Sequence, residues 1–215
     1  MPILLFPVPL TGELILWKIT ESAEELTDFL IENRRPDLIP TEKFGFAKRQ
    51  LEWLVVRCAL TSSALLKQET IIYNERGKPF LKNETGHLSI SHSYPYVCLF
   101  YHKSQNVGVD VEMMTERIFK VASKFINEQE MQWLAQPFRK EELYLLWATK
   151  EAVFKMKGGG GIDFRKNMTI NPVKLQKEGT ITLAFNKENV REEVNCYYRF
   201  LDNMILVYTI ANNGL

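Results

Sequence analysis

The chain has 215 residues and a formal net charge of +1, which argues against a general binder of nucleic acid or anionic membranes. Hydrophobic residues make up 46% of it, enough for one substantial domain or two small lobes, and no apolar run reaches the ~18 residues of a membrane span. The cysteines Cys58, Cys98 and Cys196 lack metal-ligand spacing, so we predict reduced thiols and a cytoplasmic protein.

The first half of the chain is predicted to combine two helices with short strands. The apolar pattern predicts a strand at residues 13–19. A helix at residues 22–33 follows, opened by Ser22 and Glu25 as a capping box. A longer helix is predicted at residues 42–66. Further short strands are predicted at residues 71–73, 88–91 and 97–102.

The second half is predicted to begin with a strand at Val107 and to continue through helices into a meander of strands. The helices are predicted at residues 117–125, 128–136 and 139–157. The strands are predicted at residues 168–175, 180–185, 193–201 and 204–210, with a hairpin turn at Asp202 and Asn203. Each half therefore reads as helix followed by antiparallel strands, an α+β pattern. The polar residues 103–106 are the best join, which predicts lobes at residues 1–105 and 106–215.

The strand at Val107–Glu112 alternates strictly between apolar and other residues. Three valines fall on one side, while Gly108, Asp110 and Glu112 fall on the other. Two carboxylates this close repel each other unless a cation lies between them, and hard oxygen ligands suit Mg²⁺. The glycine leaves room for a bulky group to approach. An edge strand with a solvated acidic face is the alternative.

The helix at residues 139–157 carries a stripe of functional side chains. Trp147, Glu151 and Lys155 are spaced by four residues and share one face. Such a Glu–Lys pair is ordinarily a surface ion pair, but this helix is apolar nearly all round, which indicates a buried or cleft-lining position. The glycines at residues 158–161 then end the helix. With the acidic strand, this pattern is typical of a divalent-metal site for a phosphate-bearing substrate.

Four segments between residues 49 and 161 together resemble a known family. They are Arg49–Arg57, Gly77-Lys78-Pro79 with Leu88–Ser93, Gly108–Glu112, and Trp147–Lys155. In this order they resemble the motifs of the 4'-phosphopantetheinyl transferases, which move the phosphopantetheine arm of coenzyme A onto a serine of a carrier protein. The length resembles the larger, two-lobed type that activates surfactin synthetase.

The resemblance carries an expected architecture. It implies two similar α/β lobes in a pseudo-twofold arrangement, each a long helix packed on an antiparallel sheet. It places the active site in the cleft between the lobes, a common position for ligand pockets. It also implies a monomer, in contrast to the short trimeric type of the family.

The resemblance further implies roles for the acidic residues and the lysine beside them. Asp110, Glu112 and Glu151 would hold Mg²⁺, or alternatively Mn²⁺, against the pyrophosphate of coenzyme A. Glu151 would also accept the proton of the carrier serine. Lys155 would stabilise or protonate the departing 3',5'-ADP. Coenzyme A is thus the implied co-substrate, and an apo acyl, peptidyl or aryl carrier protein is the implied partner.

A set of coenzyme A contacts is implied in the same way. It consists of Lys78, Ser91, His92, Lys150 and Arg49, with Lys78 and His92 near the 3'-phosphate or the adenosine ribose. Taken without the resemblance, Lys78 is a solvated turn lysine and His92 a strand-end histidine with local hydrogen bonds.

Two assignments within the family remain open. The remaining phosphate contacts could come from any of four basic residues, Arg34, Arg35, Lys43 and Lys48. The carrier often binds the segment after the acidic strand, here residues 113–125. Its Ile118, Phe119 and Phe125 are either exposed anchors or, as we favour, the buried face of a helix.

Other functions compete with phosphopantetheinyl transfer. One is a non-catalytic binder of coenzyme A or a carrier protein, but the intact acidic residues and Lys155 argue against it. A hydrolase could use Ser91 or Ser93 with His92 and Asp110, yet neighbours along a strand point to opposite faces, and no Gly-x-Ser-x-Gly elbow is present. A zinc site built from the three histidines has no supporting ligand spacing.

Overall fold

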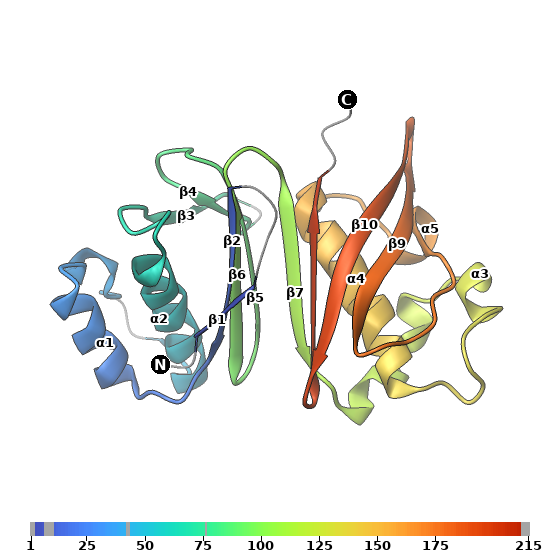
Figure 1. Cartoon of the computed structure of the whole chain (residues 1–215), viewed down its shortest axis with the longest axis horizontal. Helices are drawn as coiled ribbons and strands as arrows, with labels where there is room; N and C mark the ends of the chain where they lie inside the picture. Colours follow the sequence, from blue (N-terminus) through green and yellow to red (C-terminus); the bar gives the residue numbers. More distant parts are fainter. Residues whose placement is uncertain (1–2, 7–10, 42–43, 76, 212–215) are drawn as a thin grey trace. The chain divides into compact units, whose positions relative to one another are not determined.

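A computed structural model describes residues 3–6, 11–41, 44–75 and 77–211 (Figure 1). Lys43, one of the basic candidates, lies outside these ranges. The chain divides into two compact units, Met1–Ser104 and Gln105–Leu215. Each unit combines an antiparallel sheet with a long helix, which confirms the predicted α+β class with two sheet-bearing lobes. No helix in the described part of the chain is long and apolar enough to cross a bilayer.

The first unit is a four-stranded antiparallel sheet whose core is formed with two helices. Its elements are β1 (Ile3–Phe6), β2 (Gly12–Lys18), α1 (Ala23–Glu32), the 3-10 helix η1 (Pro36–Leu38), α2 (Ala47–Ser62), β3 (Ile71–Tyr73), β4 (Pro79–Leu81), β5 (His87–Ser93) and β6 (Tyr96–His102). The strand order is β1-β2-β6-β5, and β3 and β4 form a separate hairpin. Leucines of α1 and α2 share one buried core cluster with Trp17 and Leu99 of the sheet. Figure 1 shows the two helices on one side of this sheet.

The helices of the first unit begin and end for local reasons. The predicted capping box of α1 is present, because Ser22 Oγ accepts from the Glu25 amide and the Glu25 carboxylate accepts from the Ser22 amide. The second helix is shorter than the predicted 42–66. It begins after Phe46, whose backbone is extended, and ends at Ser63, whose hydroxyl accepts from the Leu65 and Leu66 amides instead.

The second unit is a five-stranded antiparallel sheet packed against one long helix. Its elements are β7 (Val107–Met113), η2 (Glu116–Lys120), η3 (Ala122–Lys124), α3 (Glu128–Met131), α4 (Lys140–Lys157), α5 (Phe164–Asn167), β8 (Met168–Ile170), β9 (Glu178–Lys187), β10 (Val190–Leu201) and β11 (Met204–Ile210). The order β7-β11-β10-β9-β8 makes β7 an edge strand of this sheet. Helix α4 contributes much of the core of the unit (Figure 1).

Three predicted elements of the second unit are shorter in the structure. The expected helix at residues 117–125 is two 3-10 turns, η2 and η3. The expected helix at 128–136 is the single turn α3, which Asn127 caps. The strand expected at 168–175 ends at Ile170, since Pro172 cannot donate to the ladder.

Candidate active site

Helix α4 lies directly on the acidic face of β7. A Cβ added at Gly108 would lie 1.9 Å from the carbonyl oxygen of Ala152, so only glycine permits this approach of helix and strand. The bulky group that the sequence predicted beside Gly108 is therefore the backbone of α4. Because side chains alternate along a strand, Asp110 and Glu112 lie on the same face as Gly108 and point toward the helix.

The stripe on α4 contacts both carboxylates of β7. Lys155 Nζ lies 2.6 Å from Asp110 Oδ1, in an ion pair whose lysine side chain is 26% exposed and whose aspartate is 4% exposed. Trp147 Nε1 donates to Glu112 Oε1 at 2.9 Å. Glu151 lies between these two residues on the same stripe, so its carboxyl group is close to the negative charges of both Asp110 and Glu112.

This environment changes the protonation of Glu151. Its pKa is raised to about 7, first by burial and then by the negative charge of Asp110, with a smaller contribution from Glu112. The ammonium of Lys155 opposes this shift but does not cancel it. A carboxyl group with a pKa near neutrality can take up and release a proton under physiological conditions, which is the property of a general acid–base.

The same carboxylates are the predicted metal ligands. Across the described residues, no group of three or more His, Cys, Asp or Glu side chains is arranged to hold a metal ion. Two of the three acids instead bind donors from α4, the Lys155 ammonium and the Trp147 indole. The chemistry of the donors nevertheless fits a hard divalent cation, because all three are carboxylates and the negative charge of Asp110 and Glu112 adds to burial in raising the pKa of Glu151.

Trp147 was noted in the sequence only as a member of the stripe, and its contact with Glu112 was not predicted. Its ring packs edge-on against Phe125, with ring centroids 5.3 Å apart, and tilted against Phe164 at 5.7 Å. These contacts hold the indole with its N–H directed at Glu112. The spacing of four residues from Glu151 was the one signal in the sequence that pointed to this role.

Lys150, for which the sequence predicts a contact with coenzyme A, is enclosed within the second unit. The Lys150 side chain is fully buried, and its ammonium donates to Glu130 Oε2 at 2.8 Å and to the carbonyl oxygens of Phe125 and Phe164 at 2.7 and 3.1 Å. Three acceptors satisfy its three donors. Glu130 in turn accepts from the Ile170 and Asn127 amides, so the cluster joins α4 to three neighbouring segments.

The remaining predicted coenzyme A contacts lie in the first unit. His92 is largely exposed at the end of β5, whereas Ser91 is buried, as expected for neighbours on opposite faces of a strand. The two side chains therefore do not form the nucleophile–base pair of a hydrolase. Arg49 is exposed on α2. Lys78 follows Gly77 in a tight turn to Asn74, and partial burial lowers the pKa of its ammonium.

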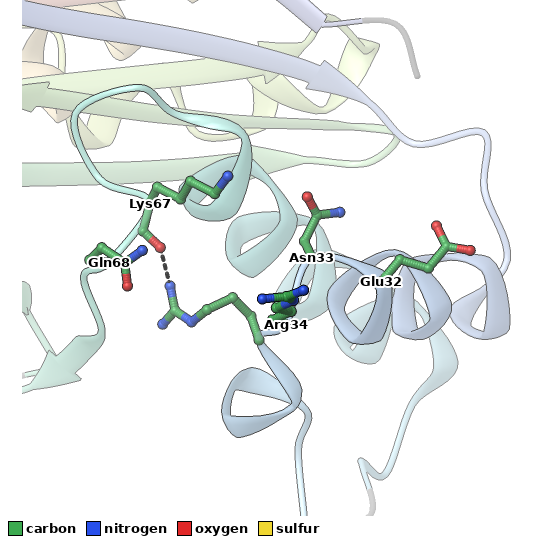
Figure 2. Close-up of a pocket in the computed structure, with 6 residues that line it drawn as sticks. Glu32, Asn33, Arg34, Lys67 and Gln68 are labelled. Atoms are coloured by element: carbon green, nitrogen blue, oxygen red, sulfur yellow. Dashed lines mark hydrogen bonds between the residues drawn. The ribbon is translucent and has the colours of Figure 1, made fainter.

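Arg34 and Arg35 line a surface hollow of about 470 Å³ together with Lys67 (Figure 2). Arg35 is buried, and its guanidinium already binds the Asp37 carboxylate and the carbonyl oxygens of Lys67 and Glu69. Of the two adjacent arginines, Arg34 is therefore the one with an exposed side chain. The hollow is open and its polar rim includes the acidic Glu32, so it does not have the character of a dedicated phosphate site.

In the segment after β7, the predicted burial of apolar residues holds for two of three. Ile118 and Phe125 are buried in the core of the second unit, while Phe119 is 39% exposed. Ile118 and Phe119 are neighbours within η2, and successive residues of a 3-10 helix point about 120° apart, so only one of the two faces the core.

Comparison with known proteins identifies a matching family. The model of the 4'-phosphopantetheinyl transferase superfamily matches residues 106–203, a range that includes Asp110, Glu112, Glu151 and Lys155. The 4'-phosphopantetheinyl transferase gsp of Aneurinibacillus migulanus is 32% identical over 149 residues, covering 67% of this chain and 60% of the relative.

Two further relatives agree. The 4'-phosphopantetheinyl transferase Sfp of Bacillus subtilis strain 168 is 30% identical over 114 residues, which cover 50% of this chain and 50% of the relative. The 4'-phosphopantetheinyl transferase AcpT of Escherichia coli strain K12 is 30% identical over 117 residues, covering 52% of this chain and 60% of the relative. The chain thus spans less than two thirds of the length of these curated relatives.

Proposed function

This chain belongs to the 4'-phosphopantetheinyl transferase superfamily, and from that premise we propose that it transfers the 4'-phosphopantetheine arm of coenzyme A to a serine of an apo carrier protein. Its similarity to gsp and Sfp supports the larger, surfactin-synthetase-activating type. The acceptor is an acyl, peptidyl or aryl carrier of fatty-acid, polyketide or peptide synthesis. We place the enzyme in the cytoplasm as a monomer, in agreement with its buried free thiols.

The observation that carries the proposal is the environment of Glu151. A carboxyl whose pKa is raised to about 7 lies between a tryptophan and a lysine, each of which binds one carboxylate of β7. In the transfer step, the serine oxygen forms a bond to the inner phosphorus of coenzyme A while the bond to the bridging oxygen of the pyrophosphate breaks. Glu151 takes the serine proton, directly or through a water molecule.

Lys155 is suited to the other end of the same step. The phosphate oxygens of the departing 3',5'-ADP gain negative charge as the bond breaks, and a nearby ammonium stabilises that charge. In the free protein the same ammonium binds Asp110 and is partly exposed, so a ligand can approach it from the solvent side. Lys155 therefore serves as an electrostatic stabiliser or a proton donor for the leaving group.

Mg²⁺ is the metal that we propose for Asp110, Glu112 and Glu151, with Mn²⁺ as an alternative. A bound divalent cation would neutralise the pyrophosphate oxygens and lower the pKa of Glu151, which keeps this carboxylate ionised and basic. The shared negative charge of the three side chains supports this assignment, because a cation would remove the repulsion that raises the pKa.

For coenzyme A binding we retain Lys78, Arg49, His92 and Ser91 as proposed contacts. The half-buried ammonium of Lys78 supports its assignment, since a desolvated cation attracts phosphate more strongly than a solvated one. The exposure of Arg49 and His92 leaves both able to meet an anionic ligand. The contact of Lys150 stays a prediction, and the three acceptors that enclose its ammonium in the free protein make it the least supported of the set.

The test is to incubate the purified protein with coenzyme A, Mg²⁺ and a panel of apo carrier proteins, and to measure the intact mass of each carrier. We expect one or more carriers to gain the mass of phosphopantetheine and 3',5'-ADP to be released. Omitting Mg²⁺ in the presence of a chelator should stop loading. Coenzyme A binding without loading of any carrier would instead support a non-catalytic binder.

A further inference from the structure

A second charged cluster lies in the first unit, where α2 meets the end of β5. Leu88 and Ile90 of β5 pack against the core that α2 helps to form, and alternation places His92 on that same face. His92 lies beyond the apolar core, and its side chain is 56% exposed. There its Nδ1 atom lies 3.3 Å from Oε2 of Glu52, a residue of α2.

The carboxylate of Glu52 is the centre of this cluster. Its other oxygen, Oε1, lies 3.8 Å from Nζ of Lys48, one turn earlier on α2. The ammonium of Lys48 also lies 5.3 Å from the centroid of the Tyr94 ring, in the turn after β5. The Glu52 side chain is only 10% exposed, while the side chains of both of its partners, Lys48 and His92, are largely exposed.

The difference in exposure indicates that Glu52 holds its exposed partners in place and does not itself meet a ligand. A carboxylate that is largely removed from water needs cationic or hydrogen-bonding partners, so Glu52 holds its two neighbours in defined positions. At His92 the contact of Nδ1 with the carboxylate orients the ring, which leaves Nε2 as the nitrogen directed away from α2. An imidazole held in this way presents Nε2 to a ligand in a defined direction.

We propose that Glu52 is a positioning residue for coenzyme A binding, which acts by holding Nδ1 of His92 so that the Nε2 edge of the ring is directed at coenzyme A. The inference rests on the proposed function and on the His92 contact within it. It adds that the affinity for coenzyme A depends on a carboxylate that does not touch the ligand, much as the partner of a metal-binding histidine sets the orientation of its ring.

Glu52→Gln tests the inference, because positioning and simple electrostatics predict opposite signs. Removing a negative charge near an anionic ligand should by itself strengthen binding. If Glu52 positions His92, coenzyme A should bind about three- to fivefold more weakly, the range of a partly exposed ion pair. The saturated transfer rate should stay within about twofold, since the contact is equally strong in the ground and transition states. Calorimetric Kd values and steady-state KM and kcat values give both quantities.

A double-mutant cycle identifies the residue through which Glu52 acts. In a His92→Ala background, Glu52→Gln should no longer weaken coenzyme A binding, whereas in a Lys48→Met background it should still do so. Glu52→Asp keeps the charge and withdraws it by one methylene, so it should weaken binding less than Glu52→Gln. The matched control is Glu69→Gln, because Glu69 is also a buried acid of the first unit but accepts from Asn83 and Thr85. This control should leave the Kd unchanged.

Four results would contradict the inference. Binding by Glu52→Gln that equals or exceeds wild-type affinity would overturn it, and so would a loss that persists without His92. If Glu52→Gln fails to fold, Glu52→Asp with wild-type affinity would overturn it equally. A wild-type protein that does not bind coenzyme A at all would overturn the proposed function and this inference with it, which separates the two failures.

Discussion

Helix α4 carries two lysine–carboxylate pairs only five residues apart, and they differ in every property that matters for function. Lys150 and Glu130 are both fully buried, and the ammonium has three acceptors within the protein. Lys155 is partly exposed, and the charge of its partner Asp110 helps to raise the pKa of the Glu151 carboxyl group. The first pair is closed and joins segments of the fold. In the second pair the Lys155 ammonium is partly exposed to solvent, so it can bind an anionic ligand in place of Asp110.

The two pairs show that neighbouring residues of one helix can have different roles, one in stability and one in the proposed site. Successive residues point about 100° apart around an α-helix, so Lys150 and Glu151 face different neighbours. Glu151 faces the acidic strand with Trp147 and Lys155. Lys150 faces the loop and short helix that provide its carbonyl partners. Substitutions in the two pairs should therefore separate activity from stability.

Glu151→Gln should have the largest effect on the open site. The amide keeps the size of the side chain but cannot accept the serine proton, so transfer should fall by about 10²–10⁴-fold, the range for a lost general base. Coenzyme A binding should weaken only modestly. Single-turnover loading of a carrier at saturating coenzyme A measures the step itself. A near-normal rate would remove Glu151 from the role of base.

Lys150→Met should break the closed pair and unfold the protein more readily. It leaves Glu130 buried without its cation, which costs about 3–5 kcal/mol of the free energy of unfolding. Urea denaturation followed by fluorescence measures this loss. The double variant Lys150→Met/Glu130→Leu should recover part of the stability, because no unpaired charge remains. If Lys150→Met unfolds at the wild-type urea concentration, the buried pair is not a structural element.

Lys155→Met is the matched substitution in the open pair, and the expected order of effects reverses. Transfer should fall by about 10²-fold through loss of charge stabilisation at the leaving group. The free energy of unfolding should fall by about 1–2 kcal/mol, less than in Lys150→Met, because the Lys155 ammonium is partly exposed although its partner Asp110 is buried. Both quantities are measured as for the two preceding variants. A stability loss equal to that of Lys150→Met would show that exposure does not distinguish the pairs.

The smallest expected effect is a pH-dependent stability difference at Glu151. Its folded pKa of about 7 lies above the ordinary value of 4.5, so the folded state binds the proton more tightly than the unfolded state. The contribution of Glu151 to stability is therefore fully present below about pH 4.5 and is lost as the pH rises to about 7. At pH 8, Glu151→Gln, which cannot ionise, should have a free energy of unfolding about 1–2 kcal/mol greater than that of the wild type, and thus a higher melting temperature.

The difference between wild type and Glu151→Gln should shrink toward pH 5, which is the internal control of this experiment. Added Mg²⁺ should narrow it at pH 8, since a cation favours the ionised carboxylate of the wild type. Equal melting temperatures of the two proteins from pH 5 to pH 8 would contradict the raised pKa.

Local patterns in the sequence predicted the elements that carry the site. The capping box of α1, the strand at Val107 and the helix from about Lys140 to Lys157 all agree with the structure. They could be predicted because each depends on neighbours within a few residues: an N-cap on the residue three positions on, a strand on period-two alternation, and a helix on a 3.6-residue period.

Elements interrupted by a single residue were predicted less well. Asn127 caps α3 at the predicted start, yet the helix ends at Met131 instead of residue 136. Pro172 ends β8 early, because a missing donor outweighs the apolar pattern there.

The sequence by itself determined which residue types the site contains and that Trp147, Glu151 and Lys155 share one face of a helix, because helical spacing follows from the covalent chain. Only the tertiary structure decided that Gly108 admits the backbone of Ala152, that Trp147 binds Glu112, and that Lys150 is enclosed. A helix that is apolar nearly all round does not reveal which of its charged residues turns inward. Burial and partners drawn from distant segments decide that, and with them the pKa of Glu151.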